Sequence, residues 1–420
     1  MSVTRPTAPR VIVLALLSWL LAACGDQPAS PPATAVGGAG GSSAGTGGTA
    51  GGSTSVGGSS GTAGSGGAGG VSAMAGSGGI SGGQGGAAGA AGSGGTGGSS
   101  MVDPGSEGDG LRTLEMPFLE APEVSQQDGV PHGVRFMFVL PTGSTERYAE
   151  ADNREINVYV PQQYVAGTPA PVLVVQDGNQ FFGFVDLVSN TLDNLIAAEK
   201  LPPIVAVFVN NGGGDAQGSH RGEEYDTLSG VYAEFIDLEI LPRVEQATAT
   251  FIPEQIVTFT KDPEGRAMLG GSSGGIASFI AAWYRPDLFR RVIAFSPSFV
   301  AQEFPVNAEH PLGAWNFHED GREDDGGIIM STDPLKPIRV WMEAGTNDYG
   351  AGTQEDPDTP YPYYDFAFAI PRAYEKMVTK GYPHVHLDVA EGAGHVDGDV
   401  VRATLPDALL WTWRGYVGGL

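Results

Sequence analysis

A short glycine-rich run, Gly270–Gly275, contains the two residues best suited to nucleophilic chemistry, Ser272 and Ser273. The run matches Gly-x-Ser-x-Gly in two registers, with an apolar segment at 267–269 before it and a helical pattern at 276–284 after it. A strand, a sharp turn of small residues and a helix lift a serine hydroxyl above a sheet. A phosphate-binding loop would need a Lys-Ser or Lys-Thr pair, which the run lacks. The pattern therefore predicts a nucleophile elbow.

A serine hydroxyl needs a base, and the base needs a carboxylate that orients it. His395 ends a glycine-rich turn that follows an apolar strand pattern at 385–389. Asp348 ends a tight turn after the strand pattern at 338–342, and Glu343, directly at the end of that pattern, is the alternative acid. Catalytic groups gather on loops at the carboxyl ends of parallel strands. We therefore expect Asp348 and His395 to meet a serine of the elbow.

The negative charge that develops on a carbonyl oxygen during such an attack needs backbone N–H donors. Ser273 is one candidate, because it stands at the start of the helix that leaves the elbow. The second donor usually comes from the loop after an earlier strand. In this chain that loop contains Gly178 and Asn179, which follow the apolar run at 171–175. We expect no metal and no cofactor in this chemistry.

Strand and helix patterns alternate through the C-terminal three quarters of the chain. Strands are predicted at 134–140, 155–160, 171–175, 204–209, 267–269, 292–295, 338–342 and 385–389, and helices at 185–200, 230–244, 276–284, 365–380 and 405–416. Apolar runs without alternation are typical of parallel strands that are covered on both faces. The order predicts an α/β fold with a mostly parallel central sheet flanked by helices.

Two long irregular stretches, 302–337 and 349–362, interrupt this alternation and carry clusters of acidic residues. Loops of this length are usually functional, and here they follow strands whose loops would shape a substrate pocket. The clusters lack the spacing of an EF-hand calcium loop, so we favour solvated loops over Ca²⁺ sites.

Collinear motifs along the domain resemble the enterochelin-esterase and esterase-D-like group of the α/β-hydrolases. The matching segments are Asp128-Gly-Val-Pro-His-Gly133, Val158-Tyr-Val-Pro161, Gln176-Asp-Gly178, Asp193-Asn-Leu-Ile196, Arg221 with Glu224-Tyr-Asp226, the elbow with Ala281-Ala-Trp-Tyr-Arg-Pro286, Gly345-Thr-Asn-Asp348, Gly394-His395 and Leu405-Pro-Asp-Ala-Leu409.

The resemblance implies a carboxylic ester hydrolase whose triad is Ser272, Asp348 and His395. In such enzymes the nucleophile is followed by x-Gly-Gly, which favours Ser272 over Ser273. It also implies a structural pairing role for Arg221 and Glu224 near the site. The expected substrate is a small-molecule or polysaccharide-linked ester. An acyltransferase of the same fold and a non-catalytic binding protein on a hydrolase scaffold remain alternatives, because a fold does not fix a reaction.

The N-terminus has the pattern of an export signal. Arg5 and Arg10 precede an apolar run at 11–23 that is too short to span a membrane. The run ends in Leu-Ala-Ala-Cys24, which resembles the lipobox of bacterial lipoproteins. The resemblance implies a signal peptide over 1–23 and a lipid on Cys24. We therefore expect a lipoprotein of the cell envelope, attached to the outer membrane or the cell surface through its lipid.

Composition divides the remaining chain and narrows its partners. Residues 24–102 are rich in Gly, Ser and Ala and predict a disordered tether, and residues 103–420 predict the esterase domain. The net charge is −26 and falls almost entirely on that domain, which argues against binding to nucleic acid. Cys24 is the only cysteine, so the domain can have neither a disulfide nor a thiolate nucleophile.

Overall fold

The computed structural model describes residues 106–215, 218–300, 302, 314–315, 327–350 and 365–418. The predicted signal peptide, Cys24, the predicted tether and the acidic clusters of the two irregular stretches lie outside the described residues. Within the described part of the chain, no helix combines the length and the apolar character that a membrane crossing requires.

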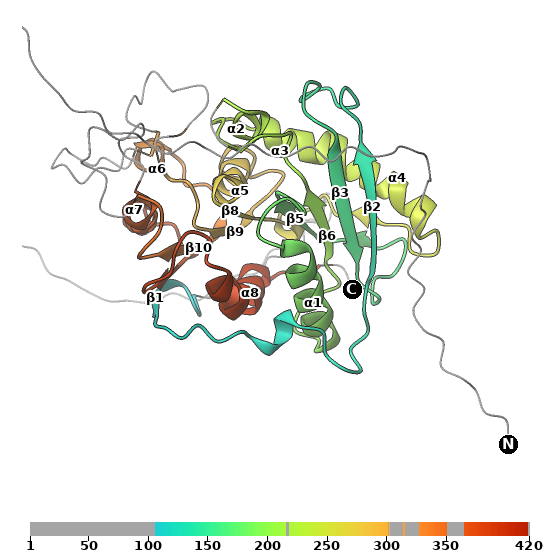
Figure 1. Cartoon of the computed structure of the whole chain (residues 1–420), viewed down its shortest axis with the longest axis horizontal. Coiled ribbons are helices and arrows are strands. Elements are labelled where there is room, and N and C mark those ends of the chain that lie inside the picture. Colours follow the sequence, from blue (N-terminus) through green and yellow to red (C-terminus); the bar gives the residue numbers. More distant parts are fainter. Residues whose placement is uncertain are drawn as a thin grey trace, which may run out of the picture. The chain divides into compact units, whose positions relative to one another are not determined.

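A nine-stranded sheet forms the centre of the described domain (Figure 1). Its strands are β1 (Gly110–Leu114), β2 (Val134–Leu140), β3 (Arg154–Val160), β5 (Val172–Gln176), β6 (Val205–Val209), β8 (Arg266–Gly271), β9 (Arg291–Phe295), β10 (Arg339–Gly345) and β11 (Val385–Ala390). The order is β1-β11-β10-β9-β8-β5-β6-β3-β2, and only the pairs β2–β3 and β3–β6 are antiparallel. A separate two-stranded pair joins β4 (Pro169–Ala170) and β7 (Thr258–Phe259).

Helices cover both faces of this sheet. They are α1 (Phe184–Ala197), α2 (His220–Tyr225), α3 (Val231–Phe235), α4 (Leu241–Phe251), α5 (Ser273–Tyr284), α6 (Gly327–Ser331), α7 (Phe366–Lys380) and α8 (Gly398–Trp413), with short 3₁₀ turns at Pro122–Val124 and Pro263–Gly265. A π-helical segment, Ile236–Ile240, joins α3 to α4. The prediction of a mostly parallel sheet flanked by helices is confirmed.

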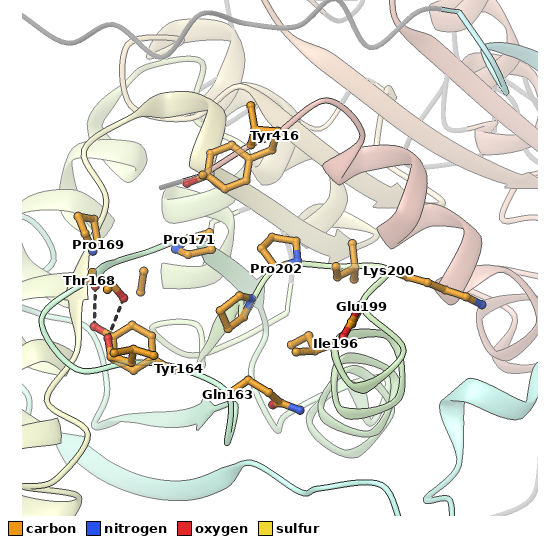
Figure 2. A pocket seen from close by; sticks show the side chains of 16 residues that line it. Gln163, Tyr164, Thr168, Pro169, Pro171, Ile196, Glu199, Lys200, Pro202 and Tyr416 are labelled. Atoms are coloured by element: carbon orange, nitrogen blue, oxygen red, sulfur yellow. Dashed lines mark hydrogen bonds between the residues drawn. The ribbon is translucent and has the colours of Figure 1, made fainter. Parts of the chain in front are cut away.

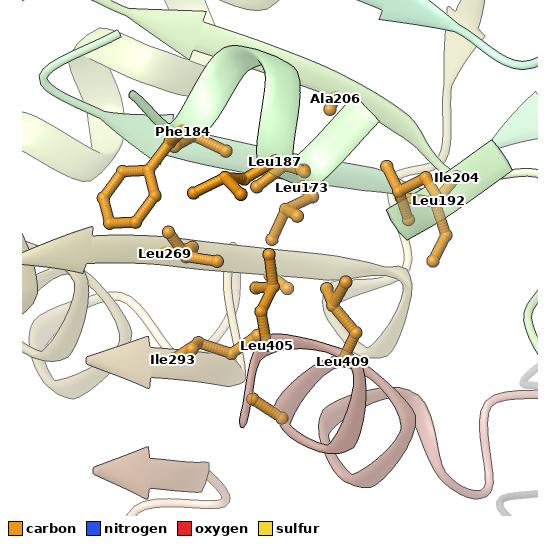
Figure 3. Close-up of a cluster of buried hydrophobic side chains, with 14 of the residues drawn as sticks. Leu173, Phe184, Leu187, Leu192, Ile204, Ala206, Leu269, Ile293, Leu405 and Leu409 are labelled. Carbon is orange, nitrogen blue, oxygen red and sulfur yellow. The ribbon is translucent and has the colours of Figure 1, made fainter. Parts of the chain in front are cut away.

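The core is divided by the sheet because successive strand residues face opposite sides. Figure 3 shows one side, where α1 and α8 pack on Leu173, Leu269 and Ile293 of three neighbouring strands. The other side is covered by α5, by α7 and by the helical run from α3 to α4. Every residue of β5, β6, β8, β9 and β10 is buried, as the unbroken apolar runs predicted.

The last helix begins earlier than its apolar pattern indicated. Asp397 caps α8, its carboxylate accepting the backbone N–H of Asp399 at 2.9 Å, so the helix starts at Gly398. Pro406 lies inside the helix and cannot donate to the Arg402 carbonyl, which accepts the N–H of Ala121 at 3.2 Å instead. A segment distant in sequence thus stabilises the interrupted helix, which local pattern could not reveal.

The edge strand β1 also has no clear sequence signal, because its residues alternate only between half-buried and exposed. Its parallel pairing with β11 is held by Arg112, whose Nε and Nη2 donate to the two carboxylate oxygens of Asp388 at 2.7 and 2.9 Å. The His386 ring lies 2.9 Å from the same carboxylate. A buried carboxylate on β11 therefore fixes β1 where hydrophobic patterning does not.

The order of the strands reverses between β5 and β8. From β5 the chain moves to β6 on one side, and it later returns to β8 on the other. In open parallel sheets, such a reversal leaves a crevice at the carboxyl ends of the two strands. The elbow after β8 and the predicted oxyanion loop after β5 both lie at this crevice.

Candidate active site

Ser272 occupies a strained turn between β8 and α5. Its backbone has φ 57° and ψ −128°, a conformation that costs on the order of 1–3 kcal/mol for a non-glycine residue. Gly270 and Gly274 make the turn possible, since a Cβ on Gly270 would lie 2.3 Å from the Gly274 carbonyl. The Ser272 N–H donates to the Phe295 carbonyl of β9 at 3.0 Å. The predicted nucleophile elbow therefore has the backbone that this chemistry requires.

The two candidate serines differ in their surroundings. Ser272 is partly exposed at the tip of the turn. Ser273 is only 3% exposed, and its hydroxyl accepts a hydrogen bond from Gln302 Nε2 at 2.9 Å. A buried hydroxyl with a fixed partner is poorly placed to attack a substrate, whereas its backbone N–H at the start of α5 remains at the elbow. This geometry favours Ser272 as the nucleophile.

Asp348 and His395 meet, as the sequence predicted. Asp348 Oδ1 lies 2.5 Å from His395 Nδ1, and Asp348 as a residue is 3% exposed. The turns that carry them interlock, because the Asn347 N–H donates to the Ala393 carbonyl at 2.9 Å. A Cβ on Gly345 would lie 2.4 Å from that same carbonyl, so only glycine permits this approach. Asp348 thus orients the imidazole with Nδ1 toward the carboxylate.

Glu343, the alternative acid, is not the partner of His395. It lies inside β10 and is fully buried, with its carboxyl group 3.4 Å from the Ser296 hydroxyl. Burial, together with the negative charges of Asp348, Asp388 and Asp397, raises its pKa well above the usual value for a glutamate. A carboxyl group in this position is a poor partner for an imidazolium.

The loop of His395 reaches the elbow through the residue that follows the histidine. A Cβ built on Gly271, next to Ser272, would lie 3.0 Å from Val396 Cγ1. The Val396 N–H donates to the Ser296 hydroxyl at 3.0 Å, and Ser296 follows Phe295, which accepts the Ser272 N–H. The loops that carry the base and the nucleophile are therefore packed on each other.

Two aromatic rings enclose the His395 imidazole. Tyr349 stacks on it with ring centroids 4.2 Å apart and an interplanar angle of 25°. Phe366, at the start of α7, presents its edge at 4.8 Å. Tyr349 remains 59% exposed, so its ring is open to a molecule bound beside the histidine. Sequence reasoning missed both aromatics, because they matter only through their contact with His395.

The loop after β5 has the sharp backbone that an oxyanion loop needs. Asp177 and Gly178 both have positive φ, 61° and 46°, and a Cβ on Gly178 would collide with Asn210. The Asn179 N–H donates to Asn210 Oδ1 at 2.8 Å and is therefore occupied. Among the three candidate donors, Ser273 and Gly178 are thus better placed than Asn179 to hold an oxyanion.

A buried ion pair fixes the loop that follows β5. Arg221 donates from Nε and Nη2 to the two oxygens of Asp177 at 2.8 and 2.9 Å, and Asn211 Nδ2 adds a third bond at 2.9 Å. Both charged side chains are almost completely buried. The structural pairing expected of Arg221 is present. The role of Asp177 was missed, although it directly precedes the predicted oxyanion glycine.

We expect Arg221→Lys to lower kcat by about 10- to 100-fold, because an ammonium cannot replace the two parallel bonds that fix the donor loop. Steady-state kinetics on a chromogenic ester measure this. Arg285→Lys is the matched control, since Arg285 makes the same two-bonded contact with Asp287 at 2.8 and 2.7 Å, beyond the far end of α5. Equal kcat losses in both variants would contradict a role for the buried pair in catalysis.

A cavity of about 720 Å³ lies near the amino ends of β5 and β6, and Figure 2 shows the residues that line it. Its lining includes Pro171 and Pro202, just before β5 and β6, together with Tyr164 and Tyr416. The elbow lies at the carboxyl end of β8, which runs parallel to β5. This cavity is therefore separate from the chemistry. Across the described residues, no group of three or more His, Cys, Asp or Glu side chains is arranged to hold a metal ion.

Comparisons with known proteins identify a family for this chain. The Esterase family, described as "Putative esterase", matches residues 149–411. The uncharacterized protein YbbA of Bacillus subtilis (strain 168) is 26% identical over 188 residues, which is 42% of this chain and 70% of that protein.

Two solved structures are similar to this chain at low identity. The enterobactin esterase FES from Shigella flexneri is 19% identical, with a TM-score of 0.45 over 70% of this chain; the chain spans 62% of its length. The ferulic acid esterase AmCE1/Fae1A from Anaeromyces mucronatus is 17% identical, with a TM-score of 0.49 over 70% of this chain and 97% of its own. Because the family match covers more than half of the chain, the protein belongs to this esterase family and is a carboxylic ester hydrolase.

Proposed function

We propose that the protein is a serine esterase that cleaves its substrate through an acyl-enzyme. The observation that carries the proposal is the 2.5 Å contact between Asp348 and His395, on a loop packed against the strained turn of Ser272. A serine on such a turn, a histidine and an orienting carboxylate are the three parts that acyl transfer needs.

In the proposed reaction, Ser272 Oγ attacks the ester carbonyl carbon while His395 Nε2 accepts the hydroxyl proton. Asp348 holds the Nδ1–H and stabilises the imidazolium. The N–H groups of Ser273 and Gly178 donate to the tetrahedral oxyanion. The C–O bond then breaks, the alcohol leaves with the proton from His395, and a water molecule activated by the same imidazole hydrolyses the acyl-Ser272 ester.

Labelling of the purified protein with a fluorophosphonate, together with hydrolysis of a p-nitrophenyl ester, tests this proposal. A serine esterase of this kind forms a covalent adduct with the probe and loses its hydrolytic activity in proportion to labelling. A protein that hydrolyses the ester without labelling would use another mechanism. A protein that does neither would be a binding protein on this scaffold.

The substrate of this site is proposed to be a small-molecule or polysaccharide-linked ester. The exposed ring of Tyr349 beside His395 offers a flat apolar surface at the position of the chemistry. Aromatic rings prefer such offset contacts with other aromatic rings. Comparing kcat/KM for acetyl, feruloyl and dihydroxybenzoyl esters shows whether an aromatic acyl group is favoured.

We further propose that the enzyme acts in the cell envelope, tethered through a lipid on Cys24. The support is the sequence alone: a charged start, a short apolar run and a cysteine at its end. Cys24→Ser is expected to move the protein from the membrane fraction to the soluble fraction of the expressing bacterium, because the acyl chains provide the attachment. Fractionation with metabolic labelling by a fatty acid measures this. Retention of Cys24→Ser in the membrane fraction would contradict lipid anchoring.

A further inference from the structure

Three polar groups beneath the His395 loop have no role in the reaction described above. They are the backbone N–H of Val396, the hydroxyl of Ser296 and the carboxyl group of Glu343. The Val396 N–H donates to Ser296 Oγ at 3.0 Å, and the Ser296 hydroxyl donates to Glu343 Oε2 at 3.4 Å. The Ser296 N–H also donates to the Glu343 carbonyl at 3.0 Å. These hydrogen bonds connect β10, through the residue after β9, to the residue after His395.

The backbone is strained at both residues that the hydrogen bond from Val396 to Ser296 joins. Ser296 has φ 45° and Val396 has φ 44°, and neither residue is glycine. A branched residue such as valine is rarely found at positive φ and needs its surroundings to hold it there. The bond from Val396 to Ser296 supplies such a restraint. Because Val396 directly follows His395, its backbone conformation sets the direction in which the histidine leaves the loop.

Glu343 fixes the orientation of the Ser296 hydroxyl. A serine hydroxyl rotates freely unless its hydrogen has an acceptor. Glu343 Oε2 is that acceptor, and it turns the lone pairs of Ser296 Oγ toward Val396. The carboxyl group lies on the same face of the sheet as Trp341, two residues earlier on β10, which is the face that α8 covers. It is fully buried.

The surroundings of Glu343 favour a neutral carboxyl group. Asp348, Asp388 and Asp397 surround it with negative charge, and burial further raises its pKa. The nearby cation Arg112 is engaged by Asp388. Within the described residues, Glu343 Oε1 has no hydrogen-bond partner, so an ionised carboxylate would be left buried and unpaired. A neutral acid can accept the Ser296 hydrogen without adding a further negative charge beside Asp348.

We propose that Ser296 and Glu343 are positioning residues for His395: a neutral Glu343 orients the Ser296 hydroxyl, which holds the strained backbone of Val396 and so fixes the direction of the His395 imidazole. The proposal rests on the proposed function, because it assigns a purpose to groups that support the same catalytic histidine. Asp348 orients the ring through Nδ1, while Ser296 fixes the backbone from which the ring extends.

The test uses Ser296→Gly, because glycine adopts φ 45° without strain and the change removes the hydroxyl together with its Cβ. We expect kcat to fall by about 10- to 100-fold, the cost of a base displaced by about 1 Å, with little change in KM or Tm. If Ser296 had only a structural role, activity would change in parallel with Tm. This variant, with an almost unchanged Tm, would then stay active. Ser189→Ala on α1 is the matched control, since Ser189 is also buried and its hydroxyl has no partner among the described residues.

Glu343→Leu and Glu343→Gln test the hydrogen bond between Ser296 and Glu343. Leucine removes the acceptor, and we expect a kcat loss similar to that of Ser296→Gly, with no further loss in the double variant because both changes break one connection. Glutamine is neutral and keeps an acceptor, so it should restore most of the activity that leucine loses. A glutamine variant as impaired as the leucine variant would overturn the neutral role of Glu343.

The rate of fluorophosphonate labelling separates this inference from the proposed function. Wild-type protein that does not label defeats the serine-esterase proposal itself. Wild-type protein that labels while Ser296→Gly labels and turns over at the same rate defeats only the positioning role. Slow labelling of Ser296→Gly at an unchanged Tm supports both.

Discussion

Replacing Ser272 with alanine is expected to abolish both fluorophosphonate labelling and ester hydrolysis, with a fall in kcat of about a millionfold. The side chain removed is the only candidate hydroxyl that is partly exposed at the strained turn. Folding stability should be retained or slightly changed, since the turn is held by Gly270, Gly274 and the bond from the Ser272 N–H to Phe295. Labelling followed by peptide mass spectrometry, with Tm measured in parallel, provides the readout.

Ser273→Ala is the companion variant, because it differs from Ser272→Ala by one position in the same turn. Its hydroxyl is bound to Gln302, and its proposed contribution is the backbone N–H, which alanine keeps. We expect this variant to label at Ser272. Labelling that survives in Ser272→Ala but disappears in Ser273→Ala would transfer the nucleophile to Ser273.

Asp348→Asn is expected to lower kcat by about 10⁴-fold with a much smaller change in KM. The carboxylate oxygen that accepts the Nδ1–H of His395 at 2.5 Å becomes part of an amide, which favours the wrong tautomer and no longer stabilises the imidazolium. The effect is large because Asp348 is 3% exposed, so water cannot replace the lost contact. Steady-state kinetics across pH, with Tm as a check on folding, measure this.

Asp287→Asn is the control for this change of a carboxylate to an amide. Asp287 is paired with Arg285 at the surface, after the end of α5 that is distant from the elbow. Its replacement should leave kcat within about twofold, because exposed ion pairs contribute little. If Asp348→Asn keeps wild-type kcat, the acid of the triad has been assigned wrongly.

The sequence by itself determined the class of fold and the position of the elbow. Apolar runs such as 171–175 are buried on both faces, and the glycines around Ser272 allow the tight turn between a strand and a helix. These signals are local, because strand period and steric freedom act over a few neighbouring residues. The order of Asp348 and His395 after the elbow followed from the same local patterns and from the resemblance to a family.

Tertiary structure alone decided which polar groups work together. It bound the Ser273 hydroxyl to Gln302, which agrees with the preference for Ser272 that the motif had given, and it placed the Glu343 carboxyl group against Ser296 and not against His395. It also engaged Asn179 with Asn210. Each outcome depends on contacts between residues far apart in the chain, and such contacts exist only once strand order and register bring the carboxyl ends of β5, β8, β9, β10 and β11 to one edge.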